Sequence, residues 1–187
     1  LANLIAYAID YFTNIQKKYG KGKERKTELR IFDTIDATKV AVANEKFYAN
    51  FEEGFIGTSL KKDQYLFDCS DIDDTITFQK DGTMKVVKVE PKTFIGKNIV
   101  HVAVWKKNDK RTVYNMIYRE GRDGPFYMKR FSVTGVTRNN DYKLASDQKG
   151  SEMLYFSANP NGEAESVTVL LKPNARIRKN KIELDFS

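Results

Sequence analysis

Hydrophobic residues in the first 19 positions recur at the spacing of an α-helix. The apolar positions that fall three or four residues apart are Leu4, Ala8, Phe12, Ile15 and Tyr19. Gly20 follows them as a candidate C-cap, and Lys17 and Lys18 suit the negative end of the helix dipole. We therefore predict a helix over residues 1–19. Because an isolated helix of this length is marginal in water, we expect it to have its own neighbouring surface.

After about Ala37 the pattern changes to the alternation of apolar and polar residues that is typical of β-strands. The clearest predicted hairpin surrounds Lys80-Asp81-Gly82, since Asp-Gly between alternating runs favours a tight turn. Its strands, and those of three further predicted hairpins, are 75–79 with 83–89, 99–106 with 111–119, 112–118 with 126–133, and 153–158 with 166–171. The last alternating run, 181–186, is expected to be a strand after which the chain stops inside a blade.

These runs are repetitive. Residues 98–118 align by pattern with residues 152–172, and residues 85–89 align with residues 129–133. Repeats of about 40–50 residues are typical of four-stranded blades in propeller-like folds. The pattern therefore predicts a mainly β, bladed domain that is preceded by one helix.

Composition and charge narrow the class of protein. The 187 residues are 41% hydrophobic and carry a net charge of +7, which favours polyanionic partners such as nucleic acid or anionic lipid. The apolar-rich stretch Leu4 to Phe12 is about half the roughly 20 residues that a membrane helix needs. The single cysteine, Cys69, excludes an internal disulfide and fits a reducing cytoplasm. The basic run Lys17 to Lys26 is either a solvated linker or a tether that contacts phosphates.

The sequence contains few residues of the types that commonly act in catalysis. The only histidine, His101, lies in an alternating run where a structural role is expected, and Cys69 is expected to be a small buried residue. The acidic cluster of Asp68, Asp71, Asp73 and Asp74 lacks the spacing of an EF-hand, so we interpret it as a turn rather than a metal site. No phosphate-binding glycine loop is present. We expect no enzymatic activity, metal or cofactor in this chain by itself.

Basic residues recur in pairs at predicted turns and strand ends. Such positions suit contact with the DNA backbone better than base reading, and a curved row of them would reward bending. Each pair could also be an ordinary solvated turn. The predicted DNA-binding residues are Lys61, Lys62, Lys106, Lys107, Lys110, Arg111, Arg119, Arg122, Lys129, Arg130 and Arg138.

Two segments resemble a known family. In residues 3–36 an apolar helix leads into Lys18-Tyr19-Gly20, a basic stretch and then Arg25-Lys26-Thr27-Glu28-Leu29. This order resembles the helix that leaves the coiled-coil gate of the A subunits of bacterial type IIA DNA topoisomerases. The strand–turn–strand pattern of residues 71–89 is similar to the blades of the C-terminal domain of those subunits.

The resemblance implies a division into residues 1–36, an exit helix with a basic linker, and residues 37–187, a DNA-binding β-pinwheel of about three blades. A pinwheel is a propeller-like disc whose blades exchange strands, and here the disc would be partial. The family implies duplex DNA binding and bending without sequence preference, which presents DNA to an ATP-dependent strand-passage core. The Gln-Arg-Arg-Gly-Gly-Lys-Gly type of loop found in gyrase is absent, which favours topoisomerase IV over gyrase.

The family further implies ATP and Mg²⁺ in other domains of the parent enzyme. Its implied partners are a topoisomerase B subunit, a second copy of the A chain and duplex DNA, in a cytoplasmic, nucleoid-associated location without a membrane. The cleaving tyrosine would lie upstream. Two alternatives remain at this point: the C-terminal domain of the gyrase A chain, and a β-propeller-like scaffold for protein interactions whose charge is incidental. A sugar- or lipid-binding hydrolase domain is disfavoured by the scarcity of histidine and of paired carboxylates.

Overall fold

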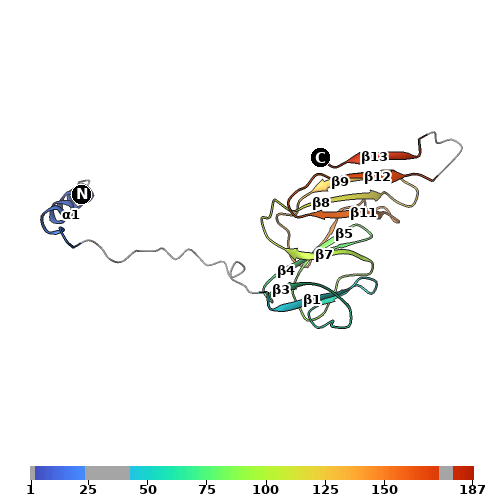
Figure 1. The fold of residues 1–187 in the computed structure, drawn as a ribbon, viewed down its shortest axis with the longest axis horizontal. Coiled ribbons are helices and arrows are strands. Elements are labelled where there is room, and N and C mark those ends of the chain that lie inside the picture. The colour runs from blue at the N-terminus through green and yellow to red at the C-terminus, as the bar shows by residue number, and fades with distance from the viewer. Residues whose placement is uncertain (1–2, 24–42, 173–178) are drawn as a thin grey trace. The chain divides into compact units, whose positions relative to one another are not determined.

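The computed structural model describes residues 3–23, 43–172 and 179–187 (Figure 1). The chain divides into two compact units, Leu1–Asp36 and Ala37–Ser187, and each is described by itself. The predicted boundary between residues 36 and 37 lies outside the described residues, as does the motif of residues 25–29.

The first unit contains the predicted helix, α1, Leu4–Tyr19. The backbone N–H of Gly20 donates to the carbonyl of Gln16 at 2.8 Å, and Lys17 and Lys18 occupy the last turn, as the sequence predicts. No residue of α1 is buried, and the side chain of Phe12 is 66% exposed. The apolar face of α1 is therefore not buried by the described residues of its own unit.

The described residues of the second unit form four antiparallel sheets. The first sheet has the order β3 (Gln64–Cys69), β1 (Glu45–Asn50), β2 (Phe55–Gly57) and β6 (Thr93–Phe94). The second has the order β10 (Asp141–Lys143), β5 (Thr83–Lys88), β4 (Asp74–Gln79) and β7 (Ile99–Trp105). The third comprises β11 (Glu152–Asn159), β8 (Val113–Arg119) and β9 (Phe126–Phe131), and the fourth β12 (Ser166–Leu170) and β13 (Lys181–Asp185). The predicted mainly β fold with one N-terminal helix is confirmed.

Two of the four predicted hairpins are confirmed. Strands β4 and β5 pair around a tight turn in which Gly82 has a φ of 78°, a conformation that favours glycine, and β8 pairs with β9. The hairpins predicted between β7 and β8 and between β11 and β12 are wrong. In both cases the chain crosses into the next sheet, because β7 pairs with β4 and β11 pairs with β8. Both crossings have the same form, which explains why residues 98–118 and 152–172 align.

Short strands link consecutive sheets. Strand β6 follows β5 along the chain but pairs with β2 of the first sheet, and β10 follows β9 but pairs with β5 of the second. Sequence patterning missed both strands, because two or three residues are too short to show a period. The exchange matches the strand-swapped blades expected of a pinwheel, and the fold is consistent with a partial β-pinwheel.

The core lies between neighbouring sheets. Phe78 and Val86 of the second sheet pack with Tyr114 and Met116 of the third, and Phe78 and Met116 are fully buried. A second cluster joins the first and second sheets through residues that include Phe47, Ile56, Val87 and Val102. Burying each such side chain stabilises the fold by about 1.5–3 kcal/mol before entropy is subtracted. The packed sheets therefore fix the strand ends from which the surface connections start.

Candidate nucleic-acid interface

The connection between β7 and β8, residues 106–112, holds the densest group of predicted DNA-binding residues. Asp109 stabilises the turn in this connection. Its carboxylate accepts hydrogen bonds from the backbone N–H of Arg111 at 2.8 Å and from the hydroxyl of Thr112 at 2.7 Å. The hydrogen bond from Thr112, followed by that from Arg111, lowers the pKa of Asp109. Asn108 takes a positive φ of 63°, which asparagine tolerates, and its N–H donates to Thr134 at 2.8 Å.

This turn places its cations outward. Lys106, Lys107 and Lys110 are exposed, and none of them makes an ion pair or a side-chain hydrogen bond with the part of the chain that the structure describes. Arg111 is also exposed, and its guanidinium donates to the side chain of Asn161 at 2.8 Å. Three positive charges without a described acidic partner therefore lie within one five-residue stretch.

Several other predicted residues have structural partners. Arg119 forms an ion pair with Glu152 at 3.2 Å, and Arg138 forms one with Asp74 at 2.9 Å. Arg130 donates to the carbonyl oxygens of Gly162 at 2.9 Å and Glu163 at 3.2 Å.

Lys129 belongs to the same group. Its ammonium group donates to the carbonyl of Leu144 and lies 5.1 Å from the centre of the Tyr118 ring. The charges of Arg119 and Arg138 are thus partly neutralised, while Lys129 and Arg130 keep their charge in fixed positions.

The remaining predicted residues are Lys61 and Lys62, in the connection between β2 and β3, and Arg122, in the turn between β8 and β9. All three are exposed and make no ion pair within the described ranges. The eleven predicted residues do not form one cluster. The β7–β8 connection and the β8–β9 turn lie at opposite ends of β8, whose seven residues span about 20 Å.

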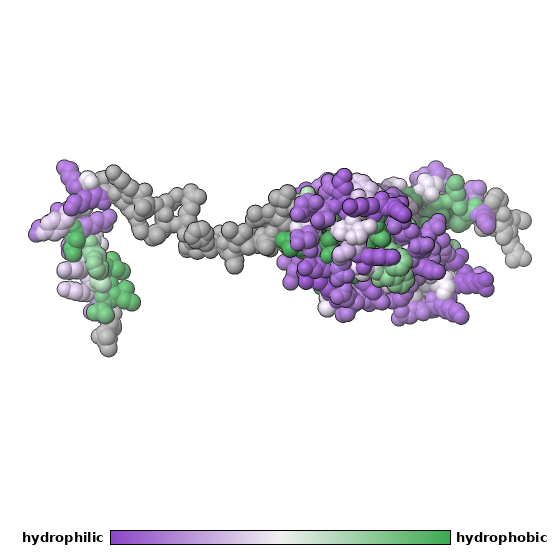
Figure 2. Space-filling model, turned by 90° about the horizontal axis from the view of Figure 1, so that it is seen from below, coloured by the Kyte–Doolittle hydropathy of each residue, from purple (hydrophilic) through white to green (hydrophobic). Residues whose placement is uncertain are grey.

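Sequence reasoning missed other cations. Lys80 pairs with Glu152 at 2.9 Å, and Lys143 pairs with Asp81 at 2.7 Å. Lys88, Lys97 and Lys149 are exposed without an ion pair to any described residue. Only their place in turns or at strand ends could have indicated them. Figure 2 shows a largely hydrophilic face on the sheet unit.

His101 and Cys69, the two residues considered for catalysis, lie among packed side chains of the fold. The His101 ring lies 5.4 Å from that of Phe156 and 6.1 Å from that of Phe78, and burial lowers its pKa. Burial raises the pKa of the fully buried Cys69 to about 11, so its thiol stays protonated at neutral pH.

Within the acidic cluster, Asp71 and Asp73 lie in the turn between β3 and β4, as the sequence predicts, whereas Asp68 belongs to β3 and Asp74 begins β4. The carboxylate of Asp73 accepts the backbone N–H of Ser70 at 2.9 Å, and Asp74 is held by Arg138. Across residues 3–23, 43–172 and 179–187, no group of three or more acidic, histidine or cysteine side chains is placed to hold a metal ion.

The described helix α1 is not long and apolar enough to cross a membrane.

Comparison with known proteins identifies the family. The family model described as topoisomerase C-terminal domain, Bacteroidota, matches residues 46–187, and the chain belongs to this family. It is similar to the A subunit of DNA topoisomerase 4 from Borreliella burgdorferi, with 29% identity over 161 residues, which is 86% of this chain and 25% of that protein. The chain thus spans about a quarter of the length of this curated relative. No solved structure matches. The resemblance to the C-terminal domain of the A subunits of type IIA topoisomerases is confirmed.

Proposed function

We propose that this domain binds duplex DNA without sequence preference, bends it, and presents it to the strand-passage core of a topoisomerase IV. The observation that carries the proposal is the β7–β8 connection, where a fold of the topoisomerase C-terminal family displays Lys106, Lys107 and Lys110 without acidic partners among the described residues.

The chemistry of this surface fits phosphate groups. An exposed ammonium is a point charge on a flexible stem and reads no base sequence, so contacts of this kind position DNA without selecting a sequence. Lys61, Lys62 and Arg122 offer similar charge at two other places on the sheet unit. Simultaneous contact with more than one of these places would reward bending of the duplex.

The chain would act as one part of a larger enzyme. We infer that the parent protein binds ATP and Mg²⁺ through other domains and works with a B subunit, paired with a second copy of its own chain. The curated relative belongs to a topoisomerase 4, and the gyrase type of basic glycine loop is absent here, so both observations favour topoisomerase IV over gyrase. The buried Cys69 and the half-buried His101 offer no nucleophile, which supports a role in binding rather than chemistry.

The test compares two triple variants of equal charge. In the first, Lys106, Lys107 and Lys110 are changed to alanine; in the second, Lys80, Lys143 and Lys181 are changed, each of which is exposed and paired with a carboxylate. Affinity for a random-sequence duplex is measured by fluorescence anisotropy over a range of salt concentrations. Each lost phosphate contact should reduce the slope of log affinity against log salt by about 0.9.

We expect the first variant to lose two to three such contacts and the second to lose few or none. Equal affinities and equal salt slopes for the parent and the first variant would remove the β7–β8 connection from the DNA path. Equal losses in the two variants would show that net charge matters and that placement does not. Bending is measured by energy transfer between dyes at the two ends of the duplex, and unchanged transfer on saturation would refute it.

A further inference from the structure

The outward face of the first sheet carries a row of aromatic side chains. The inward face packs on the second sheet through residues such as Phe47 and Ile56. Because strand residues alternate between the two faces, the registers of β1 with β2 and β3, and of β2 with β6, turn one aromatic residue of every strand outward. In the order of the strands across the sheet, these residues are Tyr65, Tyr48, Phe55 and Phe94.

The rings of this row lie close together and are open on their outer side within the described residues of their unit. The centres of the Tyr48 and Tyr65 rings are 5.9 Å apart, and those of the Phe55 and Phe94 rings are 5.2 Å apart. Tyr65 and Phe94, at the two ends of the row, are 49% and 57% exposed. Neighbouring strands lie about 4.8 Å apart, so the row is about 14 Å long. Exposed apolar groups that are contiguous, unlike scattered ones, mark an interaction site.

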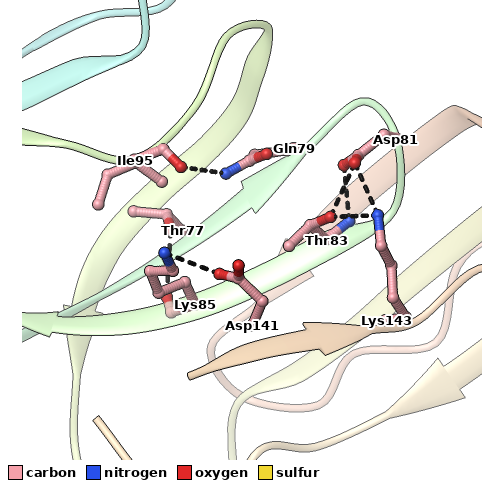
Figure 3. Close-up of polar contacts among 8 residues, drawn as sticks. All are labelled: Thr77, Gln79, Asp81, Thr83, Lys85, Ile95, Asp141 and Lys143. Atoms are coloured by element: carbon pink, nitrogen blue, oxygen red, sulfur yellow. Dashed lines mark hydrogen bonds and ion pairs between the residues drawn. The ribbon is translucent and has the colours of Figure 1, made fainter. Parts of the chain in front are cut away.

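Backbone contacts hold the end of the row in place. Phe94 belongs to the short strand β6, and the next residue, Ile95, is bonded on both sides. Figure 3 shows the side chain of Gln79, in the second sheet, donating to the carbonyl of Ile95, at a distance of 2.8 Å. The N–H of Ile95 donates to the carbonyl of Gly54 at 2.9 Å. The row is therefore preorganised, which lowers the entropy cost of binding a ligand.

Lysines flank the aromatic row. The ammonium group of Lys92 lies 4.3 Å from the centre of the Phe55 ring. Lys46, at an outward position of β1, is exposed, as are Lys61 and Lys62 in the connection that leads into β3. None of the four lysines forms an ion pair with a described residue. These cations are placed to meet the phosphate groups of a nucleic-acid strand that lies across the row.

The carboxylates near the row already have hydrogen-bond partners there. Asp63 accepts a hydrogen bond from the side-chain amide of Asn50 at 3.0 Å. Desolvation, followed by a hydrogen bond with Asp68, raises the pKa of Tyr65. The lysines are therefore the charged groups of this face that remain available to a ligand.

Exposed aromatic rings beside lysines fit unpaired nucleic acid. The face of any base can stack on an aromatic side chain, and in some RNA-binding domains an antiparallel sheet stacks about two or three bases in this way. The bases of an intact duplex are already stacked on one another, so a duplex cannot use the row. Lysine is depleted in protein–protein interfaces, so the lysine border favours a polyanion over a protein partner.

We propose that the outward face of the first sheet binds single-stranded DNA, whose bases stack on Tyr65 and Phe94 and whose phosphates contact Lys46 and Lys92. This site is separate from the proposed duplex-binding surface at the β7–β8 connection, because it lies on another sheet and requires bases that are not paired.

The test measures the affinity of the 187-residue chain for a fluorescent oligothymidine and for a duplex of equal length by anisotropy at matched salt. Combining Tyr65→Ala with Phe94→Ala should weaken oligothymidine binding at least about tenfold and leave duplex affinity unchanged. The matched control combines Phe126→Ala with Tyr127→Ala, since these side chains of the third sheet are 61% and 44% exposed. The control should leave both affinities nearly unchanged.

Four results would overturn the proposal. They are no binding of oligothymidine by the parent chain, equal oligothymidine affinity of the parent and the Tyr65→Ala, Phe94→Ala variant, equal losses in the two double variants, and an equal loss of oligothymidine and duplex binding in the first. Unfolding temperatures show that the variants are folded. A failure of the proposed duplex binding is seen separately, in the variant of Lys106, Lys107 and Lys110, which keeps the aromatic row.

Photocrosslinking gives a second readout in the parent chain. An oligothymidine in which 5-iodouracil replaces some of the bases should crosslink to peptides that contain Tyr65 or Phe94. Crosslinks confined to peptides outside the first sheet contradict the proposal. So does a dimer of the parent chain that dissociates when Tyr65 and Phe94 are replaced, because the occupant of the face is then a second copy.

Discussion

Replacing Glu165 should weaken the attachment of the fourth sheet to the third. Glu165 precedes β12, and its carboxylate accepts hydrogen bonds from Ser157 and Tyr155 of β11 and from Asn115 of β8, the last at 2.9 Å. Its backbone carbonyl accepts the N–H of Phe186 at 2.9 Å. One residue thus joins two strands of the third sheet to the start of β12 and the end of β13.

The magnitude follows from the pKa of this carboxyl group. Hydrogen bonds from Ser157, then Tyr155 and Asn115, lower the pKa of Glu165 from its ordinary value of 4.5 to about 2. That difference corresponds to about 3 kcal/mol of stability, and because the group is partly solvated we take about half, or roughly 1.5–2 kcal/mol. The contribution is present above the unfolded pKa, near 4.5, and is lost as the pH falls toward about 2.

The assay is chemical denaturation of Glu165→Gln beside Glu163→Gln, a matched change in the same connection. Glu163 is exposed, and its carboxylate accepts hydrogen bonds from Asn161 within its own turn, so its change should cost less than about 0.5 kcal/mol. Glu165→Gln should cost about 1.5–2 kcal/mol at pH 7, or roughly 3–8 °C in unfolding temperature. Its amide also places donors against the fully buried Asn115.

The pH dependence separates this explanation from a simple loss of packing. The gap in stability between the parent and Glu165→Gln should narrow as the pH falls from about 5 to about 3. The reasoning is refuted by equal stability of the two variants at pH 7, or by a gap that stays constant over that range.

The site and the fold support three further predictions. The chain alone should neither cleave nor relax DNA, and relaxation of a supercoiled plasmid without added subunits would contradict this. Deleting residues 1–28 should leave a domain that unfolds cooperatively and still binds DNA. Its affinity for DNA should be lower if the lost Lys17–Lys26 run contacts phosphates. Collapse of the sheets on deletion would show that α1 belongs to their core. Asp109→Ala should lower the free energy of unfolding by about 1 kcal/mol, because it leaves the backbone N–H of Arg111 and the hydroxyl group of Thr112 without their acceptor. It should also weaken DNA binding several-fold, although it removes a negative charge. Tighter binding would show that net charge outweighs the placement of the lysines.

The sequence predicted the strands more reliably than their partners. The β4–β5 hairpin was found because Asp81-Gly82 specifies a turn locally, and Gly82 indeed has a positive φ. The pairing of β7 with β4 was not found, since an alternating run contains no signal for which strand it joins. The exchange strands β6 and β10 were missed, because their position is set by the neighbouring sheet rather than by their own pattern.

The candidate site shows the same limit. Sequence reasoning predicted that basic residues would gather at turns, and all of the predicted residues are exposed or partly exposed. It could not predict which charges would be neutralised, because the partners are remote in the chain. Arg138 and Asp74 are 64 positions apart, and Lys143 and Asp81 are 62 apart.

The distribution of paired and unpaired cations follows from the topology of the sheets. Lys85 and Lys143 lie on paired strands, where ion pairs with Asp141 and Asp81 hold an exchanged strand to its neighbour. Lys106, Lys107 and Lys110 lie in a crossing between sheets, where the only carboxylate, Asp109, is occupied by backbone and hydroxyl donors. Because the carboxylate of Asp109 is used to fold this connection, the positive charge of the three lysines remains available to a ligand. The net charge of +7 of the whole chain therefore says less about where DNA would bind than the few places where the fold leaves cations without acidic partners among the described residues.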